Sequence, residues 1–378
     1  MTRKLFLRLD QGTLPPQDYT AIAGASSVTS IDTSDHYYQY ALETITLDHA
    51  LLLFGTNKSR FGFDLFHYLH SAQGFFGQTD EGMIVMPDST PDFKRRYSED
   101  LGVALGILLA ADTLTLQIES VTQIPTNQRL DKYAKTPDFI GFDGNNRKRV
   151  IECKGTTLPQ DIDKHRQNAK NQLASHQENG VPKFAMVTYI PSSTKLIPAF
   201  MFVSDPPIPL PAISRVLAIG LHYVTVFEFA GIPQLADSLR QVLIEQLRYD
   251  QTIAGGKRST YFTRLELSNA MDSFGQAVSR FLEHRFKVDL GGAEFIGTWR
   301  TTLDHNRTVW AFTGVSTQQL YKLQTALKNS IEPNNVFELP SFRIDQAALR
   351  AEQQYLSLFS DGTILFVTSI EPDKSQQL

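Results

Sequence analysis

The chain has 378 residues, of which 42% are hydrophobic and 20% charged, and its formal net charge is −4. This is the composition of an ordinary globular protein long enough for two or three packed units, and the small net charge does not by itself point to a polyanionic partner. The single cysteine, Cys153, excludes a disulfide framework and a cysteine-rich zinc site within one chain.

The N-terminal stretch MTRKLFLRLDQ is not typical of a secretory signal. Its apolar run is interrupted at once by Arg8 and Asp10, and no run of membrane-spanning length occurs anywhere in the sequence. We therefore expect a cytoplasmic protein with no membrane contact.

The first predicted region covers residues 1–90 and is rich in strands. Short alternating runs at 4–9 and 41–47 predict strands, and four glycines between positions 55 and 77 indicate breaks. The segment FGFDLFHYLHSAQGFF is dense in aromatic residues. We interpret it as a core cluster, with a base-stacking surface as the alternative.

The second predicted region, residues 91–195, is a mixed α/β unit. Ser98 is predicted to cap a helix that carries Glu99 and Asp100 in its first turn. Strands are predicted at 114–121, 138–143 and 147–155, a helix at 158–180 and a strand at 183–190. The predicted order is helix, three strands, helix, strand, which is compatible with one packed domain of typical size.

The third predicted region lies within residues 196–378, and its elements follow the proline-rich stretch SDPPIPLPA, which indicates a boundary. Strands are predicted at 216–229, 294–302, 308–315 and 363–370, and helices at 235–248, 267–286 and 318–329. We expect an additional α+β region that serves recognition or oligomerisation.

The stretch TPDFIGFDGNNRKRVIECKGTT, residues 136–157, predicts a β-hairpin with functional side chains. Its DGNN segment is a turn signal, and a loop of three residues would pair Asp143 with Arg147. Asp138 precedes Asp143 by as many positions as Glu152 follows Arg147, so the two acids would lie directly opposite each other. The period of two puts Lys154 on the same face and Cys153 on the other.

Two carboxylates this close repel each other unless a cation lies between them, and their hard oxygen ligands suit Mg²⁺, with Mn²⁺ as a substitute. An adjacent lysine can orient a metal-bound water and offset charge on a phosphate. The set is therefore suited to phosphodiester hydrolysis. The alternative is a surface hairpin with Glu152 and Lys154 on a solvated face; the apolar residues Val150 and Ile151 argue against it.

This pattern, Pro137-Asp138 followed after a hairpin by Glu152-Cys153-Lys154, resembles the signature of the PD-(D/E)xK nuclease superfamily. The predicted element order resembles the α-β-β-β-α-β core of that superfamily, the restriction-endonuclease-like fold. The resemblance covers only the middle quarter of the chain. It implies an α/β protein with a central restriction-endonuclease-like core, a mixed sheet flanked by helices, and additional N- and C-terminal α+β regions.

The resemblance also implies site roles. Asp138 and Glu152 would bind the metal, together with the backbone carbonyl of Cys153, and Lys154 would position the attacking water. Glu99 is the candidate for an additional acid from the first helix, because it shares a face with the small residues Gly102, Gly106 and Ala110; the alternative is an acid that only complements the helix dipole.

Polar side chains of the helix that follows the motif are candidates for contact with nucleic acid. The resemblance suggests Gln167, Lys170 and Gln172, and His165 and Arg166 could touch phosphates there; each is otherwise a solvated helix position. Together with the basic run 147–149, these residues make the most basic neighbourhood of the sequence.

We therefore expect a magnesium-dependent endonuclease that acts on nucleic acid, with DNA favoured over RNA, in bacterial restriction or anti-phage defence. A homodimer or a larger defence complex is compatible with the flanking regions. The alternatives are an RNA or structure-specific nuclease, and a non-catalytic nucleic-acid-binding or assembly protein that retains the fold.

Overall fold

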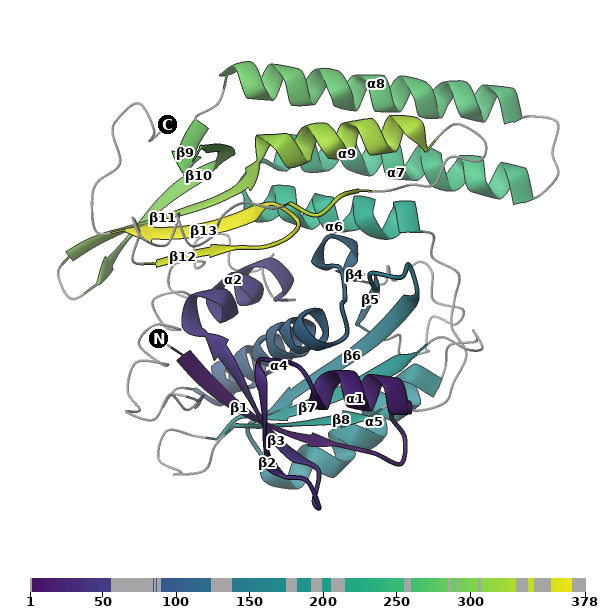
Figure 1. Ribbon diagram of the computed structural model, residues 1–378. Coiled ribbons are helices and arrows are strands. Elements are labelled where there is room, and N and C mark those ends of the chain that lie inside the picture. The colour runs from purple at the N-terminus through teal and green to yellow at the C-terminus, as the bar shows by residue number, and fades with distance from the viewer. Residues whose placement is uncertain are drawn as a thin grey trace. The chain divides into compact units, whose positions relative to one another are not determined.

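The chain folds as an α/β protein with two compact units, Met1–Ala212 and Ile213–Leu378. The computed structural model describes residues 2–55, 84, 86, 90–123, 138–174, 182–191, 199–204, 215–254, 260–284, 287–290, 292–304, 307–330, 339–342 and 355–368. In these ranges it has a mixed eight-stranded sheet, a five-stranded antiparallel sheet and eight α-helices (Figure 1).

The first unit is built on the eight-stranded sheet, whose order is β2-β3-β1-β8-β7-β6-β5-β4. Neighbouring strands are antiparallel except for the β1/β8 and β6/β7 pairs, which are parallel. Every residue of β5 and β7 is buried, as expected for inner strands covered on both faces. The strands are β1 (Thr2–Leu9), β2 (Val28–Asp32), β3 (Tyr37–Glu43), β4 (Thr122–Gln123), β5 (Phe139–Phe142), β6 (Lys148–Thr156), β7 (Lys183–Tyr189) and β8 (Phe200–Ser204).

Helices cover both faces of this sheet. Helix α4 packs on β6, helix α2 packs on α4, and α5 packs on β6 and β7 from the other face (Figure 1). The helices of the first unit are α1 (Pro16–Ala23), α2 (Thr44–Phe54), α4 (Pro91–Thr113) and α5 (Ile162–Ala174), with 3₁₀ turns at Ile118–Ser120 and Pro159–Asp161.

The unit boundaries differ from the three predicted regions, 1–90, 91–195 and 196–378. Strands β1 to β3 and β8 belong to the same sheet as the central strands, because β1 pairs in parallel with β8 and β8 pairs with β7. Backbone pairing between strands far apart in the sequence thus joins the first region and the start of the third to the middle one.

The prediction of a strand at 114–121 is wrong. A 3₁₀ turn occupies Ile118–Ser120, only Leu116 makes an isolated bridge, and the strand β4 is confined to Thr122–Gln123. The Oγ of Ser120 accepts a hydrogen bond of 2.7 Å from the backbone N–H of Phe142, so a side chain replaces a rung of the ladder.

Two other predicted elements of the first unit need adjustment. The strand predicted at 41–47 ends at Glu43 because α2 begins at Thr44. Helix α5 accounts for most of the helix predicted at 158–180. The aromatic segment, Pro137 and the predicted end of that helix lie outside the described residues.

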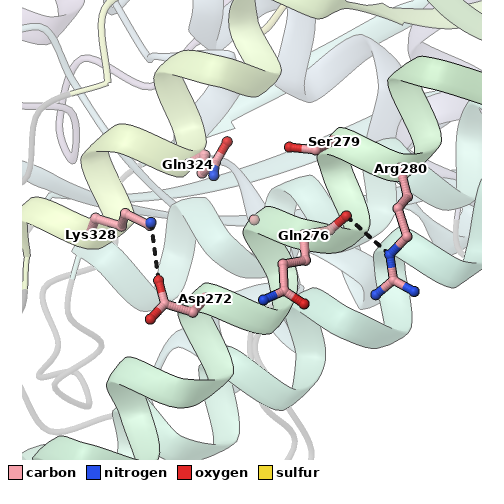
Figure 2. Close-up of a pocket in the computed structure, with 7 residues that line it drawn as sticks. Asp272, Gln276, Ser279, Arg280, Gln324 and Lys328 are labelled. Atoms are coloured by element: carbon pink, nitrogen blue, oxygen red, sulfur yellow. Dashed lines mark hydrogen bonds and ion pairs between the residues drawn. The ribbon is translucent and has the colours of Figure 1, made fainter.

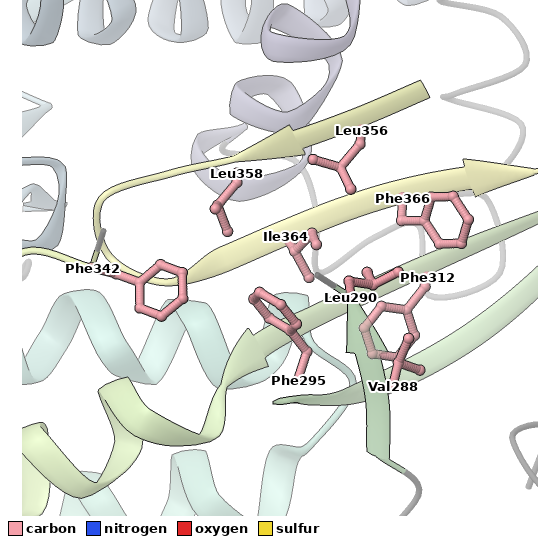
Figure 3. Close-up of a cluster of buried hydrophobic side chains, with 9 residues drawn as sticks. All are labelled: Val288, Leu290, Phe295, Phe312, Phe342, Leu356, Leu358, Ile364 and Phe366. Atoms are coloured by element: carbon pink, nitrogen blue, oxygen red, sulfur yellow. The ribbon is translucent and has the colours of Figure 1, made fainter. Parts of the chain in front are cut away.

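The second unit contains the five-stranded antiparallel sheet, in the order β12-β13-β11-β10-β9, and four helices. Figure 3 shows nine buried apolar side chains that these strands and Phe342 gather into one core cluster. The elements are β9 (Lys287–Leu290), β10 (Ala293–Asp304), β11 (Arg307–Ser316), β12 (Tyr355–Leu358), β13 (Thr363–Thr368), α6 (Arg215–Phe229), α7 (Pro233–Ala254), α8 (Thr260–His284) and α9 (Thr317–Asn329).

The strand predicted at 216–229 is the main error in this unit, because the segment forms α6. Its side chains are buried almost all round, so periodicity could not separate a helix from a strand. Gly220 lets α6 approach α7, since a Cβ there would lie 2.2 Å from a methyl carbon of Leu243. Packing against α7 therefore overrides the β-branched composition.

A buried hydrogen bond joins α6 to the turn between β12 and β13. The Nε2 of His222 lies 2.8 Å from Asp361 Oδ2, and both side chains are completely buried. Thr363 donates to Asp361 from its backbone N–H and its hydroxyl. Both carboxylate oxygens of Asp361 are therefore hydrogen-bonded within the protein.

No helix in the described part of the chain is long and apolar enough to cross a membrane.

Candidate active site

The β5–β6 hairpin has the predicted register. Phe139 pairs with Ile151 and Phe142 with Lys148, and the backbone N–H of Asp143 donates to the carbonyl of Arg147 at 2.9 Å. Within the three-residue loop, Asn146 adopts a φ of 61°, a left-handed conformation that asparagine tolerates. The predicted loop length is therefore confirmed.

This register brings Asp138, Glu152 and Lys154 together. The backbone N–H of Asp138 donates to Glu152 Oε2 at 2.8 Å. Lys154 Nζ lies 2.5 Å from Glu152 Oε1 and 3.4 Å from Asp138 Oδ2. The side chain of Glu152 is completely buried, whereas those of Asp138 and Lys154 are 27% and 23% exposed. The cluster thus has a closed inner side and an outer side open to a ligand.

The alternate residues of β6 face helix α4, as predicted from the period of two. A Cβ on Gly106 would lie 2.6 Å from Cys153 Sγ, and a Cβ on Gly102 would lie 2.8 Å from the N of Gly155. A Cβ on Gly155 would lie only 1.6 Å from the carbonyl oxygen of Ser98. Glycines on both elements therefore allow the close approach of α4 to β6 that the small-residue stripe predicts.

The face that carries Lys154 is covered by α5. Lys154 pairs with Val187 on β7, and Val187 pairs with Phe202 on β8, so the three side chains share one face of the sheet. The guanidinium of Arg166, on α5, lies 4.7 Å from the ring centroid of Phe202. Helix α5 therefore lies over the row that begins at Lys154.

The carboxyl groups of the cluster are not neutralised fully by the lysine. Burial, followed by the charge of Asp138, raises the pKa of Glu152 to about 8, and burial also raises the pKa of Asp138. Burial acts to lower the pKa of Lys154, but the charges of Glu152 and Asp138 outweigh it and raise that pKa. At neutral pH the lysine is thus protonated and Glu152 retains a proton, which a bound cation would displace.

Glu99 lies near this cluster, but not in the first turn of its helix. Helix α4 begins at Pro91, and the side chain of Thr90 accepts the capping hydrogen bond from the N–H of Phe93. The predicted Ser98 cap is wrong, since Ser98 is buried within the helix and its hydroxyl donates to the carbonyl of Arg95. The Thr90-Pro91 pair upstream starts the helix earlier than the predicted cap at Ser98.

The side chain of Glu99 is exposed and within electrostatic range of the cluster. Burial is the largest cause that raises its pKa, and the charges of Lys154 and Asp138 also act on that pKa. The predicted role of Glu99 as an additional acid stays a prediction.

The predicted contact residues on α5, the helix after the motif, differ in how exposed their side chains are. Gln167 has an exposed side chain on α5. Lys170 and Gln172 belong to the same helix, and their side chains lie outside the described part. His165 is half-buried, and the charge of Lys154 acts on its pKa. The sequence offered His165 either as a phosphate contact or as a solvated helix position, and its spacing of four from the buried Ala169 places it on the inner face of the helix.

The basic run 147–149, one part of the predicted basic neighbourhood, lies away from the cluster of Asp138, Glu152 and Lys154. Arg149 is buried and makes ion pairs of 3.0 Å with both Asp18 and Asp143, and Arg147 pairs with Asp143 at 2.9 Å. These residues lie at the loop end of the hairpin: at a strand rise of about 3.3 Å per residue, Arg149 is about 10 Å and Arg147 about 16 Å along the strand from Glu152. Arg149 fixes the hairpin to α1 and is not available to a phosphate.

The residues present fit a hard divalent cation of the magnesium type. In the described part of the chain, no three His, Cys, Asp or Glu side chains come close enough together to hold a metal. Mg²⁺ needs only one or two carboxylates, because waters and substrate phosphates complete its octahedron. The buried Glu152 Oε1, which contacts Lys154, lacks a hydrogen bond of good geometry and offers a lone pair to a cation.

A separate hollow of about 560 Å³ lies in the second unit between α8 and α9 (Figure 2). Its charged groups have partners on the same helices: Lys328 pairs with Asp272 at 3.1 Å, and Arg280 donates to the carbonyl of Gln276. None of the predicted site residues lines it. The remaining lining residues are Gly275, Ser279 and Gln324.

Comparison of the chain with protein-family models, with curated proteins and with solved structures gives no match.

Proposed function

We propose that this protein is a metal-dependent nuclease that hydrolyses phosphodiester bonds of nucleic acid, with DNA favoured over RNA. The observation that carries the proposal is the cluster of Asp138, Glu152 and Lys154 on one face of the β5–β6 hairpin, with Lys154 Nζ within 3.4 Å of both carboxylates. A buried pair of acids beside a lysine is costly to fold, and it suits a site that binds a cation and a phosphate.

Membership of the PD-(D/E)xK superfamily is part of the proposal. The order α4, β4, β5, β6, α5, β7 is helix, three strands, helix, strand, although β4 has only two residues. Strands β5 and β6 are antiparallel, and β6 and β7 are parallel. This arrangement supports a restriction-endonuclease-like core, extended by the N-terminal strands and by β8.

Each residue of the cluster has a distinct role in the proposed reaction. Asp138, Glu152 and the backbone carbonyl of Cys153 would hold Mg²⁺ or Mn²⁺. When bound, this ion would lower the pKa of a coordinated water and polarise a phosphate oxygen. Lys154 donates hydrogen bonds that orient the attacking water and offset the charge that develops on the phosphate; its raised pKa keeps it a donor and not a base.

A cleavage assay tests the proposal. Purified protein is incubated with supercoiled plasmid, linear duplex DNA, single-stranded DNA or RNA, in Mg²⁺, in Mn²⁺ or in EDTA. The variants are Asp138→Asn and Lys154→Met, and the control is Lys328→Met, which removes an exposed lysine of the second unit. We expect metal-dependent cleavage that is lost in both site variants and kept in the control.

Two results would count against this assignment. Cleavage that persists in Asp138→Asn and Lys154→Met would place the reaction elsewhere, and the absence of cleavage from every lane would leave no support for an autonomous nuclease. The preferred substrate decides between DNA and RNA. On the family resemblance alone, we assign the activity to restriction or anti-phage defence, in a homodimer or a larger complex.

A non-catalytic nucleic-acid-binding protein is the second candidate. The observation in its favour is that Lys154 contacts both carboxylates, so that the ion pairs alone hold the cluster together. The two candidates differ in their response to metal: a nuclease site that binds Mg²⁺ or Mn²⁺ in the folded state raises the melting temperature when the metal is added. A binding protein without a metal site shows no such rise and no cleavage.

A further inference from the structure

Helix α5 turns one side toward the sheet, and His165 belongs to that side. Ala169 and Leu173, four and eight residues further along the helix, are completely buried. Residues at this spacing lie above one another on one helix face. His165 is therefore one turn closer to the N-terminus on the buried face of α5, and its side chain is half-buried.

This face of α5 lies over the row of side chains that begins at Lys154. Arg166 stacks on Phe202, and Phe202 shares its row with Val187 and Lys154. The charge of Lys154 acts on His165, as does the charge of Asp161. His165 thus lies on the same face of the sheet as the candidate cluster, but on a different element.

The imidazole of His165 makes no fixed contact with the residues that the structure describes. In the described ranges, neither ring nitrogen makes a hydrogen bond or an ion pair, although the side chain is half-buried. Burial, in the first place, lowers the pKa of His165; Asp161 opposes this shift, whereas Lys154 and Lys164 add to it. A neutral imidazole has one N–H donor and one acceptor.

A neutral donor suits this position better than a second cation. Lys154 already places a positive charge here, and another positive group close to it would be repelled. An uncharged N–H can still donate to a phosphate oxygen, because it adds a hydrogen bond without adding charge. The position of His165 on the Lys154 face provides such a donor from the side of α5.

We propose that His165 is a substrate-contacting residue of the candidate site, which donates a hydrogen bond from its ring N–H to a non-bridging oxygen of the phosphodiester held at Lys154. This inference rests on the proposed nuclease function. It adds a contact from α5 to the cluster on the hairpin, and it assigns no metal-ligand role to His165.

The test compares two substitutions of similar size. His165→Gln keeps an N–H donor, and His165→Met removes it. The matched control is Lys164→Ala, which removes the exposed neighbouring charge on the same helix. Initial rates are measured on the nucleic acid that the wild-type protein cleaves, over ranges of substrate and Mg²⁺ concentration, and melting temperatures are measured in parallel.

We expect kcat/KM to fall about 10-fold or more in His165→Met, because this variant loses one hydrogen bond to a charged oxygen. In His165→Gln, which keeps a donor, kcat/KM should recover largely. The Mg²⁺ concentration for half-maximal rate should stay that of the wild type, because His165 does not bind the metal. Lys164→Ala should stay within about twofold of the wild type, since an exposed lysine makes only weak, screened interactions.

The outcomes separate this inference from the function on which it rests. An inactive wild-type protein would overturn both. An active wild type with His165→Met equal to Lys164→Ala would overturn the role of His165 alone. Equal losses in His165→Met and His165→Gln, with lowered melting temperatures, would show a packing role and would also overturn it.

Discussion

The two ends of the β5–β6 hairpin carry charged clusters with opposite electrostatic balance. At the loop end, Asp143 and Asp18 face Arg149, and Arg147 adds a second cation. Burial acts to raise the pKa of Asp143, but hydrogen bonds from the backbone of Arg147 and the charge of Arg149 bring it below its usual value. This cluster is saturated, because two acids are matched by two cations.

At the open end, Lys154 is the basic partner of two acids, and the pKa values of both acids are raised. Each cluster contains two acids, so the difference lies in the number of cations, two at the loop end and one at the open end. A saturated cluster fixes structure, whereas an unsaturated one retains capacity for a cation and a substrate. The comparison supports the proposal that the open end of the hairpin is the functional one.

Removal of Arg149 should have the largest effect on stability. Arg149→Leu leaves Asp18 and Asp143 buried without their shared cation, which costs about 3–5 kcal/mol in the free energy of unfolding. Chemical denaturation followed by circular dichroism measures it. Arg147→Leu, at an exposed position, is the control and should cost no more than about 1 kcal/mol. Similar losses for the two variants would show that the loop-end cluster does not act as described.

Lys154→Met should reduce activity strongly, and its effect on stability should depend on pH. Cleavage should fall at least about 100-fold, which corresponds to about 2.7 kcal/mol of transition-state stabilisation. Without the lysine the two carboxyls take up protons, so the variant should be close to wild type in stability at pH 5 and less stable at pH 8.5. Melting temperatures in EDTA at both pH values measure this, and an equal loss at both would contradict the charge argument.

Glu152→Gln should flatten the pH dependence of stability in the absence of metal. The pKa of Glu152 is raised in the folded state from 4.5 to about 8. Its contribution is therefore fully present below pH 4.5 and is lost as the pH rises through about 8. Gln mimics the protonated form, so the variant should be more stable than wild type above that pH by roughly 1–2 kcal/mol.

The measurement is a series of melting curves in EDTA between pH 5 and 9. Glu294→Gln is the matched control, because Glu294 lies in an exposed ion pair with Lys287 in the second unit. A Glu152→Gln curve parallel to that of the wild type would mean that Glu152 does not hold a proton in the folded protein.

Added metal should have the smallest effect on stability. The proton on Glu152 determines whether this stabilisation rises or falls with pH. Mg²⁺ at about ten times its dissociation constant should stabilise the first unit by about 1.4 kcal/mol. The rise in melting temperature should be larger at pH 8 than at pH 6, because at pH 6 the metal must displace the proton from Glu152. Asp138→Asn should abolish the rise, and a rise that persists in this variant would place the metal elsewhere.

The β5–β6 hairpin, and the face on which each of its side chains lies, could be predicted from the sequence alone. The DGNN turn set the loop length, and the period of two then put Asp138 opposite Glu152, with Cys153 facing α4. These features depend on residues close together in the chain. The glycine stripe of α4 was predictable for the same reason, since the spacing of Gly102 and Gly106 is local.

Contacts between residues far apart in the sequence could be identified only in the folded structure. The sequence could not show that Asp18, 131 residues away, neutralises Arg149, or that β1 joins β8 and merges the predicted regions into one sheet. It also could not show that 216–229 is a helix, because that segment is largely apolar and its packing against α7 selects the conformation. Turn chemistry and side-chain period act within a few residues, whereas burial and charge pairing are decided by the whole fold.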